Sequence, residues 1–216
     1  MKVLIACENS GVVRNAFENL GHDAMSCDLL KSTTIGKHYE GSIFDLDLSS
    51  FDLLIAHPPC TYLTISAAWA YKERNEINKN LSPNKLYGTE RKAARKEAIK
   101  FFLKLANSKV KKIAIENPVG VMSTAWRKPD QYIQPYQFGH NASKKTGLWL
   151  KNLPLLEPTK FIEPRFINGK SRWSNQTDGG QNKLTPSENR WQIRAKTYSG
   201  IAEAMANQWG KANESS

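Results

Sequence analysis

The fold of this chain is decided by residues 2–28, which read KVLIACENSGVVRNAFENLGHDAMSCD. Residues 2–7 form a continuous apolar run, as expected for a buried strand. Apolar side chains recur at helical spacing over residues 11–20, and a glycine then ends the helix. Residues 23–28 give a second strand, which ends in Asp28. A strand, a helix and a strand within about thirty residues predict the βαβ unit of a parallel, nucleotide-binding sheet, and therefore an α/β fold.

Further regular elements follow along the chain. Residues 51–56 (FDLLIA), 111–118 (KKIAIENP) and 147–151 have the composition of strands. Periodic apolar positions predict helices over residues 89–107 and 200–209. These elements extend the sheet and supply helices to cover it.

Two long segments show little periodicity. Residues 61–88 are polar and rich in asparagine, so we expect a long loop that ends at a helix cap at Thr89. Residues 119–190 are rich in proline, glycine and isolated aromatics, and we expect them to be largely irregular apart from the strand at 147–151. Loops of this length usually carry function.

Composition limits the class of protein. A chain of 216 residues can bury the core of one α/β domain. Its short N-terminal apolar run is broken by Glu8 and fits neither a signal peptide nor a membrane span, so we expect a soluble, cytoplasmic protein without membrane contact. The cysteines, Cys7, Cys27 and Cys60, have no metal-ligand spacing, and the four histidines are not paired. We therefore expect reduced thiols and no metal.

The charge is distributed unevenly. Residues 1–60 carry 4 Lys or Arg against 8 Asp or Glu, a net charge of −4, whereas residues 61–216 carry 27 against 12, a net charge of +15. A basic region with interspersed Trp, Tyr and Asn is typical of a surface that binds a polyanion, most commonly nucleic acid. The alternative is a generally basic protein with a solvated surface.

A cysteine follows the predicted strand at 51–56, in the turn His57-Pro58-Pro59-Cys60. Reacting groups in open α/β sheets gather at the carboxyl ends of strands. The two prolines end the strand and stiffen the turn, so the thiol is held in a fixed place, as suits a nucleophile. A lone cysteine is more often a small buried hydrophobe, but Cys60 follows its strand and precedes a polar loop.

The strand at 111–118 ends similarly, with Glu116 and Asn117 before Pro118. We expect Glu116 and Cys60 to face one cleft, where the thiolate adds to an electrophilic ring carbon and the carboxyl group exchanges a proton with a ring nitrogen. The alternative for Glu116 is a solvated cap at a strand end.

The turn at residues 8–11 (ENSG) and the following helix predict a cofactor cradle. Gly11 lets the backbone approach a ligand, and the helix N-terminus lends its amide groups. Asp28, about twenty residues on, is placed to accept hydrogen bonds from ribose hydroxyls. A tight turn with a capping aspartate has the same pattern.

These features resemble cytosine-5 DNA methyltransferases in their order along the chain. The segments HPPCTYL, IENPVGV, QPYQFGH and GIAEAMANQWG are similar to those of small phage or prophage proteins of this family, and the resemblance covers nearly the whole chain. It implies a class I methyltransferase-like (Rossmann-like) domain over residues 1–216, with a mixed, mostly parallel sheet flanked by helices. A small irregular DNA-recognition region would occupy approximately residues 120–190.

The resemblance also implies a mechanism. Cys60 would attack carbon 6 of a cytosine flipped out of DNA, and Glu116 would contact ring nitrogen 3 and the exocyclic amine. Carbon 5 would take a methyl group from S-adenosyl-L-methionine and then lose its proton. Lys144 and Lys145 stand where the family has paired arginines near the target base, and they lack the bidentate guanidinium fork.

A cofactor site follows from the same resemblance. Asp28 would hold the ribose, and Asp45 would contact the adenine amine. The glycine-rich first motif of the family is reduced here to Glu8-Asn9-Ser10-Gly11. The remaining positions implied near the cofactor are Cys7, Glu8, Asn9, Gly11, His57 and Pro58. For His57, at its strand end, a place near the target is the alternative. We expect a bacterial host cytoplasm if the chain is encoded by a phage or prophage, and either a monomer or a homodimer.

Three other interpretations remain open. The His-Pro-Pro-Cys turn is also a variant of the turn used by amino-group methyltransferases, although His57 is a poor substitute for Asn or Asp there. A related enzyme could transfer another group or act on a free nucleotide. A DNA-binding protein could keep the fold without chemistry, and its binding would then persist without any donor.

Aromatic and basic side chains in the irregular region are candidate DNA contacts by stacking and phosphate pairing. Packing within the loops is the alternative for each of them, and His140 is expected to be structural. The candidates are Trp126, Arg127, Arg165, Arg172 and Trp173.

Overall fold

The computed structural model describes residues 1–77, 80–185, 187 and 190–211. Its main feature is a sheet with the strand order β3-β2-β1-β4-β5-β7-β6, seven strands within the described residues. Strands β1 to β5 run parallel, and β7 is antiparallel to both of its neighbours, β5 and β6. The bounds are β1 Lys2–Ala6, β2 Asp23–Asp28, β3 His38–Glu40, β4 Leu53–Ala56, β5 Lys112–Pro118, β6 Gln131–Ile133 and β7 Thr146–Lys151.

This topology confirms the expected fold class. The order reverses between β1 and β4, which places a topological switch point beside the carboxyl ends of these strands. The single reversed strand, β7, makes the sheet mixed but mostly parallel. The chain has a Rossmann-like α/β fold, with a mixed, mostly parallel sheet flanked by helices.

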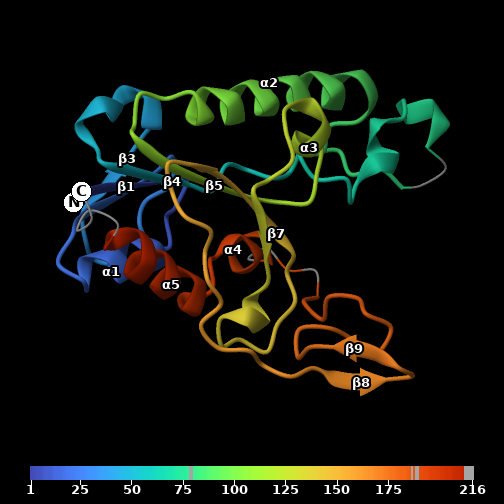
Figure 1. The fold of residues 1–216 in the computed structure, drawn as a ribbon. Coiled ribbons are helices and arrows are strands. Elements are labelled where there is room, and N and C mark those ends of the chain that lie inside the picture. The colour runs from blue at the N-terminus through green and yellow to red at the C-terminus, as the bar shows by residue number, and fades with distance from the viewer. Residues whose placement is uncertain (78–79, 186, 188–189, 212–216) are drawn as a thin grey trace.

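Helices cover both faces of the sheet. Helices α1 (Val12–Glu18) and α5 (Ser199–Gly210) lie on one face, and the long helix α2 (Gly88–Ala106) lies on the other, as Figure 1 shows. A strand buried on both faces needs apolar side chains at every position, and all four residues of β4 are fully buried. The continuous apolar runs of β1 and β4 have this cause.

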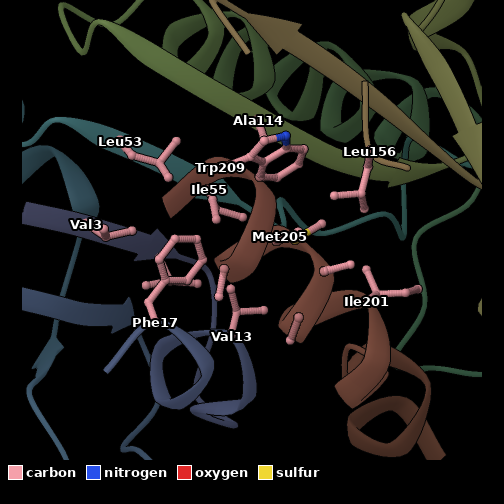
Figure 2. Packing of buried hydrophobic residues seen from close by; sticks show 14 of the residues in the cluster. Val3, Val13, Phe17, Leu53, Ile55, Ala114, Leu156, Ile201, Met205 and Trp209 are labelled. Carbon is pink, nitrogen blue, oxygen red and sulfur yellow. The ribbon is translucent and has the colours of Figure 1, made fainter. Parts of the chain in front are cut away.

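The core therefore forms two layers. On the first face, alternate strand residues such as Val3, Ile5 and Ile55 pack against Phe17 of α1 and Trp209 of α5 (Figure 2). The intervening residues, among them Leu4, Leu54 and Ile113, pack under Phe102 and Leu105 of α2 on the second face.

The helices α1, α2 and α5 agree with the sequence prediction to within a few residues, but the predicted cap of α2 does not. The cap of α2 is Tyr87, which has no capping hydrogen bond from its side chain. Thr89 lies inside the helix, and its hydroxyl donates to Glu73 Oε1 at 2.8 Å. The prediction of Thr89 as the cap is therefore wrong, because the preceding loop supplies an acceptor that the local sequence does not reveal.

The two segments expected to be irregular contain short elements. The loop after β4 holds the 3₁₀ helices η3 (Ala68–Tyr71) and η4 (Arg74–Glu76), and residues 78–79 lie outside the described part. The later segment was predicted with one strand, but it has more, because three-residue strands carry too little periodicity to detect. Its elements are α3 (Met122–Ala125), β6, η5 (Pro135–Gln137), β7, β8 (Arg165–Ile167), β9 (Lys170–Arg172) and the start of α4 (Arg190–Ala195).

Strands β6 and β7 belong to the central sheet, and beyond β7 the buried Leu156 still packs in the core and is hydrogen-bonded to Gln131 of β6. There β8 and β9 pair as a hairpin that projects away from the sheet in Figure 1. Two further 3₁₀ helices, η1 (Ile43–Asp45) and η2 (Leu48–Ser50), connect β3 to β4. None of the described helices has the length and apolar character needed to cross a membrane.

Candidate active site

The carboxyl ends of β4 and β5 lie side by side, because the two strands are parallel neighbours with Ala56 opposite Ile115. The next residue of each chain segment, His57 and Glu116, therefore projects at the same edge of the sheet. Their side chains meet with His57 Nδ1 2.6 Å from Glu116 Oε2, and they are only 10% and 12% exposed. The structure thus brings together two residues that are 59 positions apart in sequence.

The electrostatics of this pair favour its charged form. Burial alone would lower the pKa of His57, but the hydrogen bond and charge of Glu116, with the charge of Glu8, raise it above its ordinary value. Burial would likewise raise the pKa of Glu116. The positive charge of Lys144 and the bond to His57 outweigh that effect and lower this pKa to about 2.

The turn that carries Cys60 is fixed by hydrogen bonds to its backbone. The His57 amide donates to the Ala6 carbonyl oxygen at 3.0 Å, and the buried Asn117 side chain donates through Nδ2 to the Pro58 carbonyl oxygen at 2.7 Å. The Cys60 carbonyl oxygen accepts from the amides of Leu63 and Thr64 at 3.0 and 2.9 Å. The stiff turn expected from its prolines is thereby held to both β1 and β5.

Residue Cys60 is exposed. Its thiol has a raised pKa, chiefly because neighbouring protein atoms keep water away from it, while the positive charges of Lys144 and Arg194 act in the opposite direction. The negative charge of Glu116 also reaches it. The thiol is therefore protonated at neutral pH, and it lies within the electrostatic field of Glu116 and Lys144.

The two lysines between β6 and β7 have different surroundings. Lys144 is held through its backbone amide, which donates to Gln134 Oε1 at 2.9 Å, and its charge acts on Cys60 and Glu116. Lys145 instead places Nζ 4.4 Å from the centre of the Tyr132 ring. Lys144 joins the site, whereas the described contact of Lys145 is a cation–π contact away from it.

Arg194, in α4, was not predicted from the sequence. It comes from a segment more than 130 residues after Cys60, yet its charge acts on the Cys60 thiol. No motif or periodicity marks this arginine in the sequence. Only the tertiary structure, which brings α4 near the turn after β4, reveals it.

The ends of β1 and β2 are organised differently. The buried carboxylate of Glu8 accepts hydrogen bonds from the amides of Val13 and Arg14, at 2.7 and 3.2 Å, and so caps α1. Gly11 has a φ of +70°, and a β-carbon there would lie 2.1 Å from Thr34 Oγ1. In this structure the glycine is required by the loop after β2, which packs against the ENSG turn.

That loop is bound tightly to the turn. The Thr33 amide donates to the Asn9 carbonyl oxygen at 2.8 Å, and the Thr34 hydroxyl donates to that of Ser10 at 3.3 Å. The fully buried Arg14 donates through its guanidinium to side chains of Ser26, Ser32 and Thr34 and to the Ile35 carbonyl oxygen.

Two acidic residues lie at this end of the sheet. Asp28 ends β2 and accepts from the Leu30 amide through Oδ1 at 2.9 Å, while the exposed Asp45 ends η1. Burial and then Asp28 raise the pKa of Cys7 to about 12, and burial, Asp28 and Asp45 raise that of Cys27 to about 11. The two carboxylates thus act on neighbouring thiols, which are poor nucleophiles at neutral pH.

Most of the candidate DNA contacts have partners within the protein. Arg165 pairs with Asp178, and Arg172 Nε donates to the Asp178 carbonyl oxygen at 2.9 Å. Trp173 stacks on Tyr136 with ring centres 4.4 Å apart. Among the described residues these three side chains have the contacts expected of loop packing.

Histidine 140 also has a structural contact, because its Nε2 accepts from the Gly200 amide at 2.9 Å at the start of α5. Trp126 lies beside Arg127, whose guanidinium is 4.7 Å from the tryptophan ring centre. In the described part of the chain, no three His, Cys, Asp or Glu side chains are grouped so that they could hold a metal ion.

Comparison with known proteins gives structural neighbours only. No family model matches the chain, and no curated protein matches its sequence. One similar structure is an E. coli protein described as a candidate DNA modification methyltransferase encoded within a prophage. The identity is 12% and the TM-score 0.43, over 74% of this chain and 51% of that one. Another is a mutant of DNMT2 from Spodoptera frugiperda, with 15% identity and a TM-score of 0.40, over 78% and 56%. The chain thus spans about half the length of each.

Proposed function

We propose that this chain methylates cytosine in DNA at carbon 5, with S-adenosyl-L-methionine as the donor. The observation that carries the proposal is the shared edge of β4 and β5, where an exposed thiol on a rigid turn lies in the field of a buried carboxylate and a lysine. An addition reaction needs these three functions: a nucleophile, a group that exchanges a proton with the ring, and a positive charge beside both.

Each residue then has a role. Cys60, once deprotonated, attacks carbon 6 of a cytosine turned out of the helix, because this atom is inaccessible within stacked DNA. Glu116 contacts ring nitrogen 3 and the exocyclic amine. The ammonium group of Lys144 stabilises negative charge on the thiolate and the carboxylate, whose pKa values it lowers.

The residues at the ends of β1 and β2 fit the adenosyl part of the donor. Asp28 uses one carboxylate oxygen for the Leu30 amide, and its second oxygen has no hydrogen bond among the described residues, so it suits a ribose hydroxyl. The carboxylate of Asp45 suits the adenine amine. When bound, the donor supplies an electrophilic methyl group.

The other residues implied near the donor lie in turns of the backbone or make contacts within the protein. Cys7 and Asn9 lie in the turn after β1, and Pro58 in the turn after β4. Glu8 and Gly11 are engaged with α1 and with Thr34. This close packing keeps an alternative open, in which the fold transfers a different group or takes another donor.

DNA as the substrate is supported by charge. The part of the chain after Cys60 has a net charge of +15, and α2 presents exposed basic residues such as Lys92, Lys96 and Lys100. We assign target recognition to the region of approximately residues 120–190, where the β8–β9 hairpin projects from the sheet.

The test is to incubate the protein with unmethylated DNA and S-adenosyl-L-methionine, digest the DNA to nucleosides and separate them by mass. We expect a 5-methylcytosine product that is lost in Cys60→Ala and retained in Cys27→Ala, which removes a buried thiol outside the site. A methylated amino group that forms without Cys60 would assign the chain to amino-group methylation. Unmodified DNA, bound with or without the donor, would contradict the proposal.

A further inference from the structure

The imidazole of His57 is buried in contact with Glu116. Its Nδ1 faces Glu116 Oε2 at 2.6 Å, and its Nε2 is buried without a hydrogen-bond partner among the described residues. A buried nitrogen without a partner costs about 1–3 kcal/mol. The bond to Glu116 is therefore the interaction that holds the ring in this place.

The contact has a fixed direction. The carboxylate accepts through Oε2, so Nδ1 of His57 carries a hydrogen while the imidazole is positively charged. The other carboxylate oxygen is not used by His57. The Thr146 side chain also acts on Glu116 and lowers its pKa, and the Cys60 thiol feels the charge of this carboxylate.

The charged groups that face this pair come from several elements. Glu8, after β1, favours a positive imidazole, and Lys144, before β7, opposes it. Lys144 also holds Glu116 in its ionised form, so a lone Glu116 would have no proton to give at neutral pH. Cys60 completes the surroundings, with Arg194 beside it. A proton source other than the carboxyl group itself is needed.

We propose that His57 is a positioning residue for the reaction, and that the His57–Glu116 pair stores the single proton that ring nitrogen 3 of the target cytosine takes up. The proposal rests on the proposed function and names a further residue for it. Of the two positions expected for His57, near the cofactor or near the target, it assigns the target-base side of the site.

The Cys60 thiol first loses its proton to solvent. The sulfur–carbon 6 bond then forms, the electrons of the carbon 5–carbon 6 double bond move through carbon 4 to nitrogen 3, and that nitrogen takes a proton from the Glu116 carboxyl group as His57 Nδ1 passes its own proton to the carboxylate. The pair is then a carboxylate and a neutral imidazole with its hydrogen on Nε2. Carbon 5 takes the methyl group, whose bonding electrons stay on the donor sulfur. Solvent takes the carbon 5 proton, which restores the double bond and expels the thiolate, and nitrogen 3 returns its proton to the pair.

The matched variants are His57→Asn and His22→Asn. An asparagine amide can donate to Glu116 from about the position of Nδ1, but it cannot hold the transferable proton. His22 precedes β2 at the opposite end of the sheet, so its replacement controls for the loss of a histidine.

We expect His57→Asn to lower kcat for 5-methylcytosine formation on the order of 100-fold, within the usual range for a general acid. KM for DNA should stay within about threefold, because the hydrogen bond to Glu116 is kept. The alkaline limb of the pH profile should move to lower pH. An unchanged kcat and profile would overturn the inference while leaving the proposed function intact.

A second measurement does not depend on turnover. The titration of the His57 ring can be followed by NMR in the wild type and in Glu116→Gln. Its signals are assigned by their absence in His57→Asn or by sequential assignment. We expect His57 to titrate above its ordinary pKa of 6.5 in the wild type and lower in Glu116→Gln. Identical titration curves in the wild type and in Glu116→Gln would contradict the storage of a proton by the His57–Glu116 pair. A wild type that makes no 5-methylcytosine would overturn the proposed function and the catalytic role of His57 with it, whatever the titration shows.

Discussion

Two ends of the same sheet edge differ in how their polar groups are satisfied. At the ends of β1 and β2, Glu8 caps a helix, and Arg14 binds Ser26 of β2 and three groups of the neighbouring loop. At the ends of β4 and β5, polar atoms of His57 and Asn117 are buried without partners among the described residues, and Cys60 is exposed. A protein that leaves buried polar atoms unsatisfied gives up stability, and such sites are commonly functional.

The comparison predicts a division of effects. Substitutions at the β1–β2 end should mainly lower stability, because they break contacts that the folded chain makes with itself. Substitutions at the β4–β5 end should mainly lower activity. Each prediction below separates these two outcomes.

The largest effect is expected at Cys60. In Cys60→Ser the turnover of cytosine methylation should fall at least about 1,000-fold, since a neutral hydroxyl is a far weaker nucleophile than a thiolate. Its free energy of unfolding should change by less than about 0.5 kcal/mol, because the residue is exposed. Turnover assays and denaturant unfolding measure the two quantities. If Cys60→Ser loses stability but keeps turnover, Cys60 stabilises the fold and is not the nucleophile.

The next effect is expected at Arg14, which is fully buried. Arg14→Met should lower the free energy of unfolding by about 3 kcal/mol, because it leaves the Ile35 carbonyl and several hydroxyl groups without a donor. Denaturant unfolding measures this, with Lys31→Met on the exposed part of the same loop as the control. A loss below 1 kcal/mol would show that the loop does not depend on this arginine.

Gly120 tests how firmly the turn that carries Cys60 is anchored. A β-carbon at this position would lie 2.1 Å from the Leu63 carbonyl oxygen, which accepts from the Val121 amide at 2.8 Å. Gly120→Ala should therefore displace the turn after Cys60 and cost about 2 kcal/mol of stability. Gly179→Ala is the control, because the nearest atom to its β-carbon is 3.9 Å away. Equal stability of the two variants would show that the turn can shift without strain.

The smallest effect is expected in the pH dependence of stability. The pKa of Glu116 is lowered from 4.5 to about 2, so its contribution is present above pH 4.5 and is lost as the pH falls toward 2. The pKa of His57 is raised above 6.5, so its contribution is complete below pH 6.5 and is lost as the pH rises through the raised value.

The free energy of unfolding of the wild type should therefore exceed that of Glu116→Gln by the largest amount between pH 4.5 and 6.5. We expect it to vary by about 1 kcal/mol across the range, because desolvation offsets much of the attraction in a buried pair. Unfolding at a series of pH values checks this. A difference that is constant with pH would contradict a charged pair.

Local sequence predicted secondary structure correctly wherever the pattern of apolar residues lay within one strand or helix. The apolar runs of β1 and β4 are buried on both faces, as their composition predicts, and the parallel sheet follows from the βαβ pattern. The short strands β6, β8 and β9 were missed, because three residues cannot show a period. The Thr89 cap was wrong because Glu73, which it contacts, lies 16 residues earlier.

The sequence by itself determined the fold class, the positions of Cys60 and Glu116 at strand ends, and the basic character of the chain after them. These properties depend on residue type, spacing along one strand or helix, and total charge. Only the tertiary structure decided that His57 pairs with Glu116, that Lys144 and Arg194 act on Cys60, and that Gly11 is packed against Thr34. Those contacts join residues from separate elements, and their distances depend on how the sheet orders its strands and where each loop returns, which no local pattern encodes.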